Sequence, residues 1–271
     1  MGRPRRGYTI VEVLLTFAIS ATLFASAMIL FNGQQGRTAF SQAMYDLDSK
    51  VKSYVAQVAG GTFPDSQNYT CRIGSSGRPV LELTTSNIGT NQECIFLGRA
   101  IQVIPDYNLI YIYPILGTRN QYSGSTDLGV AATSFDQTNA GPAVDNSGNF
   151  LLADEYKLLG SATVTSSTVV GQSVQAGLLG FYNSLQNDGV TSGSSSVSLV
   201  AKAYPFDSKL ENIKSGELRA CIEEAPPCDN LTDITSWSLC MHGNDERQSA
   251  VLKVNSLPSG VSTELSFTEC T

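Results

Sequence analysis

The longest apolar segment of the chain lies near its amino terminus and predicts a helix. From Tyr8 to Phe31 there are 24 residues, and Glu12 is the only charged one among them. At about 1.5 Å of rise per residue, a helix of this length is roughly 36 Å long, which is enough to cross a hydrocarbon core of about 30 Å. We therefore expect residues 8–31 to span a membrane once, with one carboxylate near the start of the span.

A second hydrophobic pattern follows and extends the same helix. Between residues 37 and 59, apolar side chains recur every three or four positions, which predicts a helix with one buried face. The apolar positions are Phe40, Met44, Leu47, Val51, Tyr54 and Val58, and the opposite, solvent-facing side carries Arg37, Gln42, Asp48 and Lys52. Gly60-Gly61 predicts the end of the helix. The chain thus predicts one helix of about 50 residues, with a membrane-spanning half over residues 8–31 and an amphipathic half over residues 32–60.

Beyond this helix, the shorter periodicity of strands begins. Segments rich in β-branched and aromatic residues predict strands over residues 80–84, 94–104 and 108–116. Pro105-Asp106 predicts a hairpin turn between the last two of them. Because apolar residues occupy both faces of the strand over residues 108–116, we expect that strand to be central or covered.

The middle of the chain is more polar and gives weaker patterns. Residues 117–149 are rich in Gly, Ser, Thr, Asn and Asp, which predicts a long loop. Residues 169–185 fit either a pair of strands or a short helix, and residues 189–196 fit a Gly/Ser-rich hairpin or loop.

The carboxy-terminal part again predicts strands. They are expected over residues 196–204, 217–222, 235–242, 247–255 and 261–267, with a turn at residues 242–246. Trp237, Leu239 and Met241 alternate with Ser236, Ser238 and Cys240, which predicts an antiparallel sheet with one face on the helix. The predicted fold class is therefore α+β, a long amino-terminal helix packed on an antiparallel β-sheet domain over residues 61–271.

Composition and charge favour an extracellular surface over a cytosolic enzyme. Only 15% of the residues are charged, well below the roughly 25% of average proteins. The formal net charge is −7, and it would fall to −10 if Arg3, Arg5 and Arg6 were removed. Nonspecific DNA binding requires cations that neutralise phosphates, so DNA is not an expected partner.

An enzymatic site would have to be built around a single histidine. His242 is the only one in the chain, and it lies at a predicted turn, so Ser-His-Asp or Cys-His catalysis would have to use it there. The chain has no Gly-x-Ser-x-Gly, phosphate-loop or Gly-x-Gly-x-x-Gly motif. The paired acids Asp154-Glu155 and Glu223-Glu224 are more simply explained as solvated surface residues. We therefore expect no enzyme activity and no cofactor.

All six cysteines follow the apolar segment. They are Cys71, Cys94, Cys221, Cys228, Cys240 and Cys270. The arginines before the apolar segment place the amino terminus in the cytoplasm, so the cysteines face an oxidising side where disulfides form. Six cysteines allow fifteen pairings, among which a sequence does not choose. The pairing that closes the shortest loops is Cys71–Cys94, Cys221–Cys228 and Cys240–Cys270. A zinc site is the alternative, but the lack of Cys-x-x-Cys and the single histidine disfavour any metal.

The first residues form a recognisable signal. Arg3, Arg5 and Arg6 precede Gly7 and Tyr8, and Glu12 is the fifth residue after that glycine. A short basic leader ending in Gly, an aromatic residue and a Glu at this spacing resemble the class III signal of type IV prepilins and pseudopilins. The resemblance implies that residues 1–7 are a leader, cut between Gly7 and Tyr8 by a membrane prepilin peptidase that then methylates the amino group of Tyr8. It also implies a pilin-like fold.

The same resemblance implies a structural function. The protein would be a pilin, minor pilin or pseudopilin of a type IV pilus-like filament. It would begin as a single-pass protein of the cytoplasmic (inner) membrane, with its carboxy-terminal domain outside, and end in an extracellular filament. Glu12 of one subunit would pair with the amine on Tyr8 of its neighbour, so that two charges that are costly in lipid neutralise each other. Leu14, Leu15, Phe17, Leu23 and Phe24 would supply apolar packing between subunits. The length favours a minor subunit or a tip adhesin with a surface ligand.

Two other interpretations of the apolar segment remain open. In the first, it is an ordinary anchor that tolerates Glu12, and the protein is a membrane-anchored extracytoplasmic ligand-binding domain or adhesin that does not polymerise. In the second, it is a secretory signal peptide with residues 13–24 as the apolar region and Ala25-Ser26-Ala27 as the cleavage site. The apolar run continues to Phe31, which an ordinary signal peptide does not need.

Overall fold

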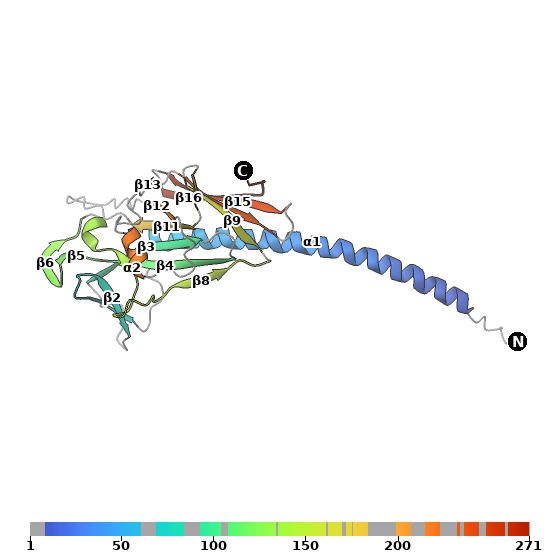
Figure 1. Ribbon diagram of the computed structural model, residues 1–271, viewed down its shortest axis with the longest axis horizontal. Helices are drawn as coiled ribbons and strands as arrows, with labels where there is room; N and C mark the ends of the chain where they lie inside the picture. The colour runs from blue at the N-terminus through green and yellow to red at the C-terminus, as the bar shows by residue number, and fades with distance from the viewer. Residues whose placement is uncertain are drawn as a thin grey trace.

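One long helix projects from a globular domain built of short strands (Figure 1). The computed structural model of the protein describes residues 9–60, 69–83, 93–103, 108–133, 135–160, 162–169, 172–174, 176–183, 199–206, 215–222, 232–233, 236–243, 248–257 and 260–270.

The helix α1 spans Ile10–Ala59, 50 residues, so the predicted long helix is confirmed. It begins at Thr9, whose hydroxyl accepts a hydrogen bond from the Glu12 amide, and it ends at Gly60, whose N–H donates to the Ala56 carbonyl. Capping of this kind satisfies backbone groups that a helix end leaves unpaired. Figure 1 shows the amino-terminal half of α1 extending away from the domain in a gentle curve.

The strands form antiparallel pairs throughout the described residues, which confirms the α+β class. One sheet has the order β13-β12-β11-β3-β4-β7, with β8 also paired to β4, and a second has the order β10-β9-β14-β15-β16. β1 pairs with β2, and β5 with β6. The strands are β1 (Tyr69–Ile73), β2 (Pro79–Leu83), β3 (Cys94–Val103), β4 (Leu109–Thr118), β5 (Asn120–Ser123), β6 (Thr126–Ala131), β7 (Gly141–Pro142), β8 (Asp154–Lys157), β9 (Thr163–Val169), β10 (Gln172–Val174), β11 (Ala176–Asn183), β12 (Leu199–Phe206), β13 (Thr232–Asp233), β14 (Ser236–His242), β15 (Ser249–Leu257) and β16 (Gly260–Ser266).

The second half of α1 shares one apolar core with both large sheets. All six apolar positions predicted from the periodicity are buried, and they pack with Trp237, Leu239 and Met241 of β14 and with Ile110 and Ile112 of β4. The predicted packing of the carboxy-terminal sheet on the helix is confirmed. Burial of an apolar stripe, at roughly 25 cal/mol per Å², stabilises this half of the helix.

The strand β4 is covered on both faces, as its sequence predicts. Ile110 and Ile112 face the core around α1, whereas Tyr113 and Ile115 belong to a second apolar cluster on the opposite face, which includes Leu218. The hairpin of β3 and β4 is confirmed by its antiparallel register, and its predicted turn at Pro105-Asp106 lies outside the described residues.

The predicted strand over residues 217–222 is wrong, because this segment is part of the helix α2, Ser215–Ile222. Leu218, Cys221 and Ile222 are buried against the outer face of the seven-stranded sheet. Their spacing of three and four is helical, but eight residues are too few for that period to exclude alternation. The segment is helical because a helix buries these three side chains together on the face of the sheet.

The predicted long loop over residues 117–149 is also wrong. It contains the end of β4, the hairpin of β5 and β6, the short 3-10 helix η2 (Phe135–Thr138) and β7. The strand β6 is exposed along its whole length, and its apolar alternation is limited to Leu128 and Val130, which is too short to predict a strand within a polar segment. In Figure 1, β5 and β6 lie at the end of the domain opposite the projecting helix.

The ambiguous region is resolved in favour of strands. β9, β10 and β11 account for the described part of residues 163–183, and β10 and β11 belong to different sheets. The predicted hairpin or loop over residues 189–196 lies outside the described residues.

One position assigned to the solvent-facing side of the helix is buried. Asp48 is only 8% exposed. Its carboxylate accepts hydrogen bonds from the Thr263 hydroxyl and from the Lys52 ammonium, each at 2.7 Å. Because β16 lies along this side of α1, the helix is covered over a wider arc than its apolar stripe predicts.

Candidate functional site

The candidate site is the exposed amino-terminal half of α1. Residues Ile10–Met28 are long and apolar enough to cross a membrane, and none of this segment is buried in the protein. Its large apolar side chains have exposed fractions between 49% and 80%; they are Ile10, Val11, Val13, Leu14, Leu15, Phe17, Ile19, Leu23, Phe24 and Met28. Contiguous exposed apolar surface of this extent is typical of a membrane or protein contact.

Three hydroxyl side chains in this half donate hydrogen bonds to carbonyl groups of the helix itself. Thr16 donates to the Val13 carbonyl at 2.8 Å, Thr22 to the Ile19 carbonyl at 2.9 Å, and Ser26 to the Thr22 carbonyl at 2.8 Å. Such bonds remove the need for water, which hydrocarbon does not supply. Glu12 is the only charged side chain of this segment, and its carboxylate therefore has the strongest need of an external partner.

Glu12 is the third residue of α1 and is exposed to solvent. Its place in the first turn puts the carboxylate near the positive end of the helix dipole, which stabilises an anion there by about 0.3–1 kcal/mol. No cation of the described residues lies within ion-pair distance of it. Gly7 and Tyr8 lie outside the described residues, so the processing site stays a prediction.

The other half of α1 is fixed to the domain by a buried arginine on β3. The Arg99 guanidinium donates to Gln57 Oε1 at 2.9 Å and to Asp154 Oδ2 at 3.3 Å, and it lies 4.7 Å from the centre of the Tyr54 ring. Burial lowers the pKa of Arg99, while the Asp154 carboxylate opposes that shift. Sequence analysis missed this residue, although a lone arginine inside an apolar strand is a signal that could have marked it.

Two of the predicted disulfides are confirmed. Cys71–Cys94 joins β1 to the start of β3, with 6.2 Å between Cα atoms, and Cys240–Cys270 joins β14 to the end of the chain, with 5.7 Å. Cys221 is disulfide-bonded as well. Its predicted partner, Cys228, lies outside the described residues.

His242 lies beside one of these disulfides. Potential ligand atoms of Cys240, His242 and Cys270 are within 4.8 Å of one another. Both sulfurs are bonded to each other, so neither is a free thiolate, the form in which cysteine binds a metal. The turn predicted after His242 lies mostly outside the described residues.

No protein-family model matches this chain, and no curated protein or solved structure matches it either. The site combines three features: an apolar half-helix without a partner surface among the described residues, one carboxylate in its first turn, and a firm attachment to a disulfide-bonded domain.

Proposed function

We propose that this protein is a structural subunit of a type IV pilus-like filament, a minor pilin or pseudopilin, processed between Gly7 and Tyr8. The observation that carries the proposal is the exposed apolar half of α1 with Glu12 as its single charge. The resemblance of residues 3–31 to the class III signal of prepilins supports it.

The exposed half-helix has two environments in this proposal. Before assembly, its apolar side chains contact lipid; after assembly, they contact the helices of other copies. Lipid tails are as apolar as leucine, so apolar area alone does not favour the second state. Glu12 is the residue that favours the assembled state over the state in lipid. An unpaired carboxylate costs about 2.5–3.5 kcal/mol at mid-bilayer, less near the edge, and pairing with the amine on Tyr8 of a neighbouring subunit relieves that cost.

The second candidate is an anchored extracytoplasmic ligand-binding domain that does not polymerise. It uses the same apolar helix, and its disulfides equally suit an oxidising exterior. It makes no use of the carboxylate of Glu12, so that residue separates the two candidates.

Mass spectrometry of the amino terminus of the protein isolated from its cells tests the processing step. We expect N-methyl-Tyr8 in the wild-type protein and an uncut leader in the Gly7→Ala variant. A wild-type chain that keeps its leader would indicate a plain anchor, and one that begins at Met28 would indicate a secretory signal peptide. Either result would refute the proposal.

Recovery of sheared filaments tests assembly. The Glu12→Gln variant keeps the size of the side chain but removes its charge, so we expect normal cleavage and at least a tenfold loss of protein from the filament fraction, a change equivalent to about 1.4 kcal/mol. Thr16→Val is the matched control, because it changes a neighbouring polar residue whose hydroxyl donates to carbonyl groups of its own helix. Normal filament incorporation of Glu12→Gln would favour the anchored domain.

A further inference from the structure

The five-stranded sheet has a polar outer face. Trp237, Leu239 and Met241 of β14 point into the core, so the residues between them point outward. The register then aligns outward-facing residues across the strands. One row contains Thr168, Ser238, Lys253 and Glu264, and the next contains Ser166, Cys240, Val251 and Ser266.

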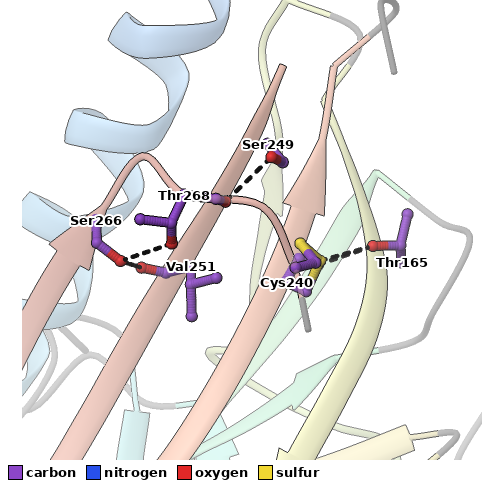
Figure 2. The surroundings of a disulfide bond; sticks show 7 residues. Thr165, Cys240, Ser249, Val251, Ser266 and Thr268 are labelled. Atoms are coloured by element: carbon purple, nitrogen blue, oxygen red, sulfur yellow. Dashed lines mark hydrogen bonds between the residues drawn. A yellow bond between two sulfur atoms is a disulfide. The ribbon is translucent and has the colours of Figure 1, made fainter. Parts of the chain in front are cut away.

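After β16, residues 267–270 cross this face and cover part of it (Figure 2). We call this carboxy-terminal segment the wall. Cys270 is bonded to Cys240 in the middle of the sheet. The Ser249 hydroxyl donates to the Thr268 carbonyl at 3.0 Å, and the Ser266 hydroxyl lies 3.4 Å from that of Thr268. The carboxy-terminal segment is therefore held on the sheet by a covalent bond and by hydrogen bonds.

A bulge in β9, the strand on the other side of β14 from β15, places a hydroxyl against the Cys240–Cys270 disulfide. The register between β9 and β14 shifts between Cys240 and Met241, where Thr165 is the extra residue. The Thr165 hydroxyl lies 3.1 Å from the sulfur of Cys240. Figure 2 shows Thr165 pointing toward Cys240 from the neighbouring strand. Bulges commonly redirect a side chain at the edge of a site.

Between the sheet and this wall lies a cavity of about 300 Å³. Its lining residues are Ser166, Thr168, Ser238, Cys240, Val251, Lys253, Ser266, Thr268, Glu269 and Cys270. The volume is at the lower end of the range for small-molecule sites, roughly 300–1,000 Å³, and corresponds to a ligand of about one sugar ring.

The lining has a definite chemistry. Five of its side chains are hydroxyls, each able to donate one hydrogen bond and to accept two. Lys253 is its one cation, and this ammonium has no ion-pair or hydrogen-bond partner among the described residues. Glu269 adds an acceptor. Many hydroxyls around one free ammonium suit a ligand that carries several hydroxyls and one negative charge.

We propose that this pocket binds a small hydroxylated organic anion, with an acidic monosaccharide as the simplest example. The carboxylate of the ligand pairs with Lys253, and its hydroxyls exchange hydrogen bonds with Ser166, Thr168 and Ser238. Glu269 on the carboxy-terminal wall accepts from a ligand hydroxyl. This inference does not depend on the filament proposal, since it uses no residue of α1.

Binding is measured by titrating the full chain in detergent micelles with glucuronate, glucose and acetate, with calorimetry or ligand-observed magnetic resonance as the readout. We expect glucuronate to bind with a Kd of about 1 mM, and the two partial probes to bind at least tenfold more weakly. Comparable binding of acetate would show only an attraction to a surface charge. That result, or no binding of glucuronate at about ten times the expected Kd, would overturn the proposal.

Matched variants locate the site. Lys253→Met should weaken glucuronate binding at least tenfold, to the level of glucose, whereas Lys157→Met, on the exposed strand β8, should change nothing. Ser238→Ala should weaken it about threefold to tenfold, whereas Ser262→Ala, outside the cavity lining, should not. Unchanged binding in Lys253→Met would refute the assignment.

The wall gives a second, independent test. A Cys240→Ser/Cys270→Ser double variant keeps Lys253 and the serines of the sheet but releases the carboxy-terminal segment. We expect loss of glucuronate binding with the buried emission of Trp237 retained, which shows that the core stays folded. Binding equal to that of the wild type would exclude the wall from the site and contradict the proposed pocket.

Discussion

Replacing Asp154 with alanine tests how the helix is held on the domain. Asp154 is the acidic partner of Arg99 among the described residues, at 3.3 Å. The arginine side chain is 4% exposed, whereas that of Asp154 is 56% exposed. Among the described residues, the variant therefore leaves a buried guanidinium with Gln57 as its remaining hydrogen-bond acceptor and Tyr54 beside it.

The magnitude follows from the geometry. At an effective dielectric constant of about 20, two unit charges 3.3 Å apart attract each other by roughly 5 kcal/mol. Water around the exposed carboxylate screens most of that attraction, so we expect a loss of about 1–2 kcal/mol in the free energy of unfolding. Removing one partner of a buried pair is costly because the remaining charge is left uncompensated.

Arg99→Met gives the decisive comparison. It removes the buried charge and fills much of its volume with an apolar side chain, while Asp154 remains solvated. We expect it to be less destabilising than Asp154→Ala, because replacing a buried charge by apolar volume is often neutral. The double variant should then be no less stable than Arg99→Met alone.

Fluorescence of Trp237 during urea unfolding in micelles provides the assay. This residue is the only tryptophan of the chain and is 1% exposed in the core around α1, so its emission reports on that core. Glu155→Ala is the control, because it removes the neighbouring exposed acid. The explanation would be refuted if Arg99→Met lowered the free energy of unfolding more than Asp154→Ala does. It would also be refuted if Asp154→Ala and Glu155→Ala lowered it equally.

Two further predictions concern stability. Replacing Cys71 and Cys94 together with serine opens a loop with a sequence separation of 23 residues and should lower the free energy of unfolding by about 3–4 kcal/mol; a change below about 1 kcal/mol would show that the loop is ordered without its bond. Burial, together with a 2.6 Å hydrogen bond to Asp46, raises the pKa of Tyr156 above its usual value. Its contribution to stability is therefore complete below about pH 10 and is lost as the pH rises through the folded pKa. As the pH rises from about 8 to 11, the stability of Tyr156→Phe should fall less than that of the wild type. The urea midpoints of the two proteins measure this fall, and an equal fall in both would contradict the role of Tyr156.

Much of the helix and its chemistry was predictable from sequence. The length of α1 follows from an apolar run that is continued by a helical stripe, and its end at Gly60 follows from the Gly60-Gly61 pair. Two disulfides match the pairing that closes the shortest loops, although the sequence itself does not choose among the fifteen pairings. The exposed carboxylate of Glu12 also needs no tertiary information, because a charge inside an apolar run is visible in the chain itself.

The tertiary structure decided the features that depend on what covers a segment. α2 is a helix because a sheet face is there to bury Leu218 and Ile222, and Asp48 is buried because β16 lies along the helix. The pocket is lined on one side by the carboxy-terminal segment, which a disulfide joins to Cys240 of β14. Local sequence determines which face of an element is apolar or polar, whereas contacts between distant segments determine which polar groups lose their water and which partners they gain.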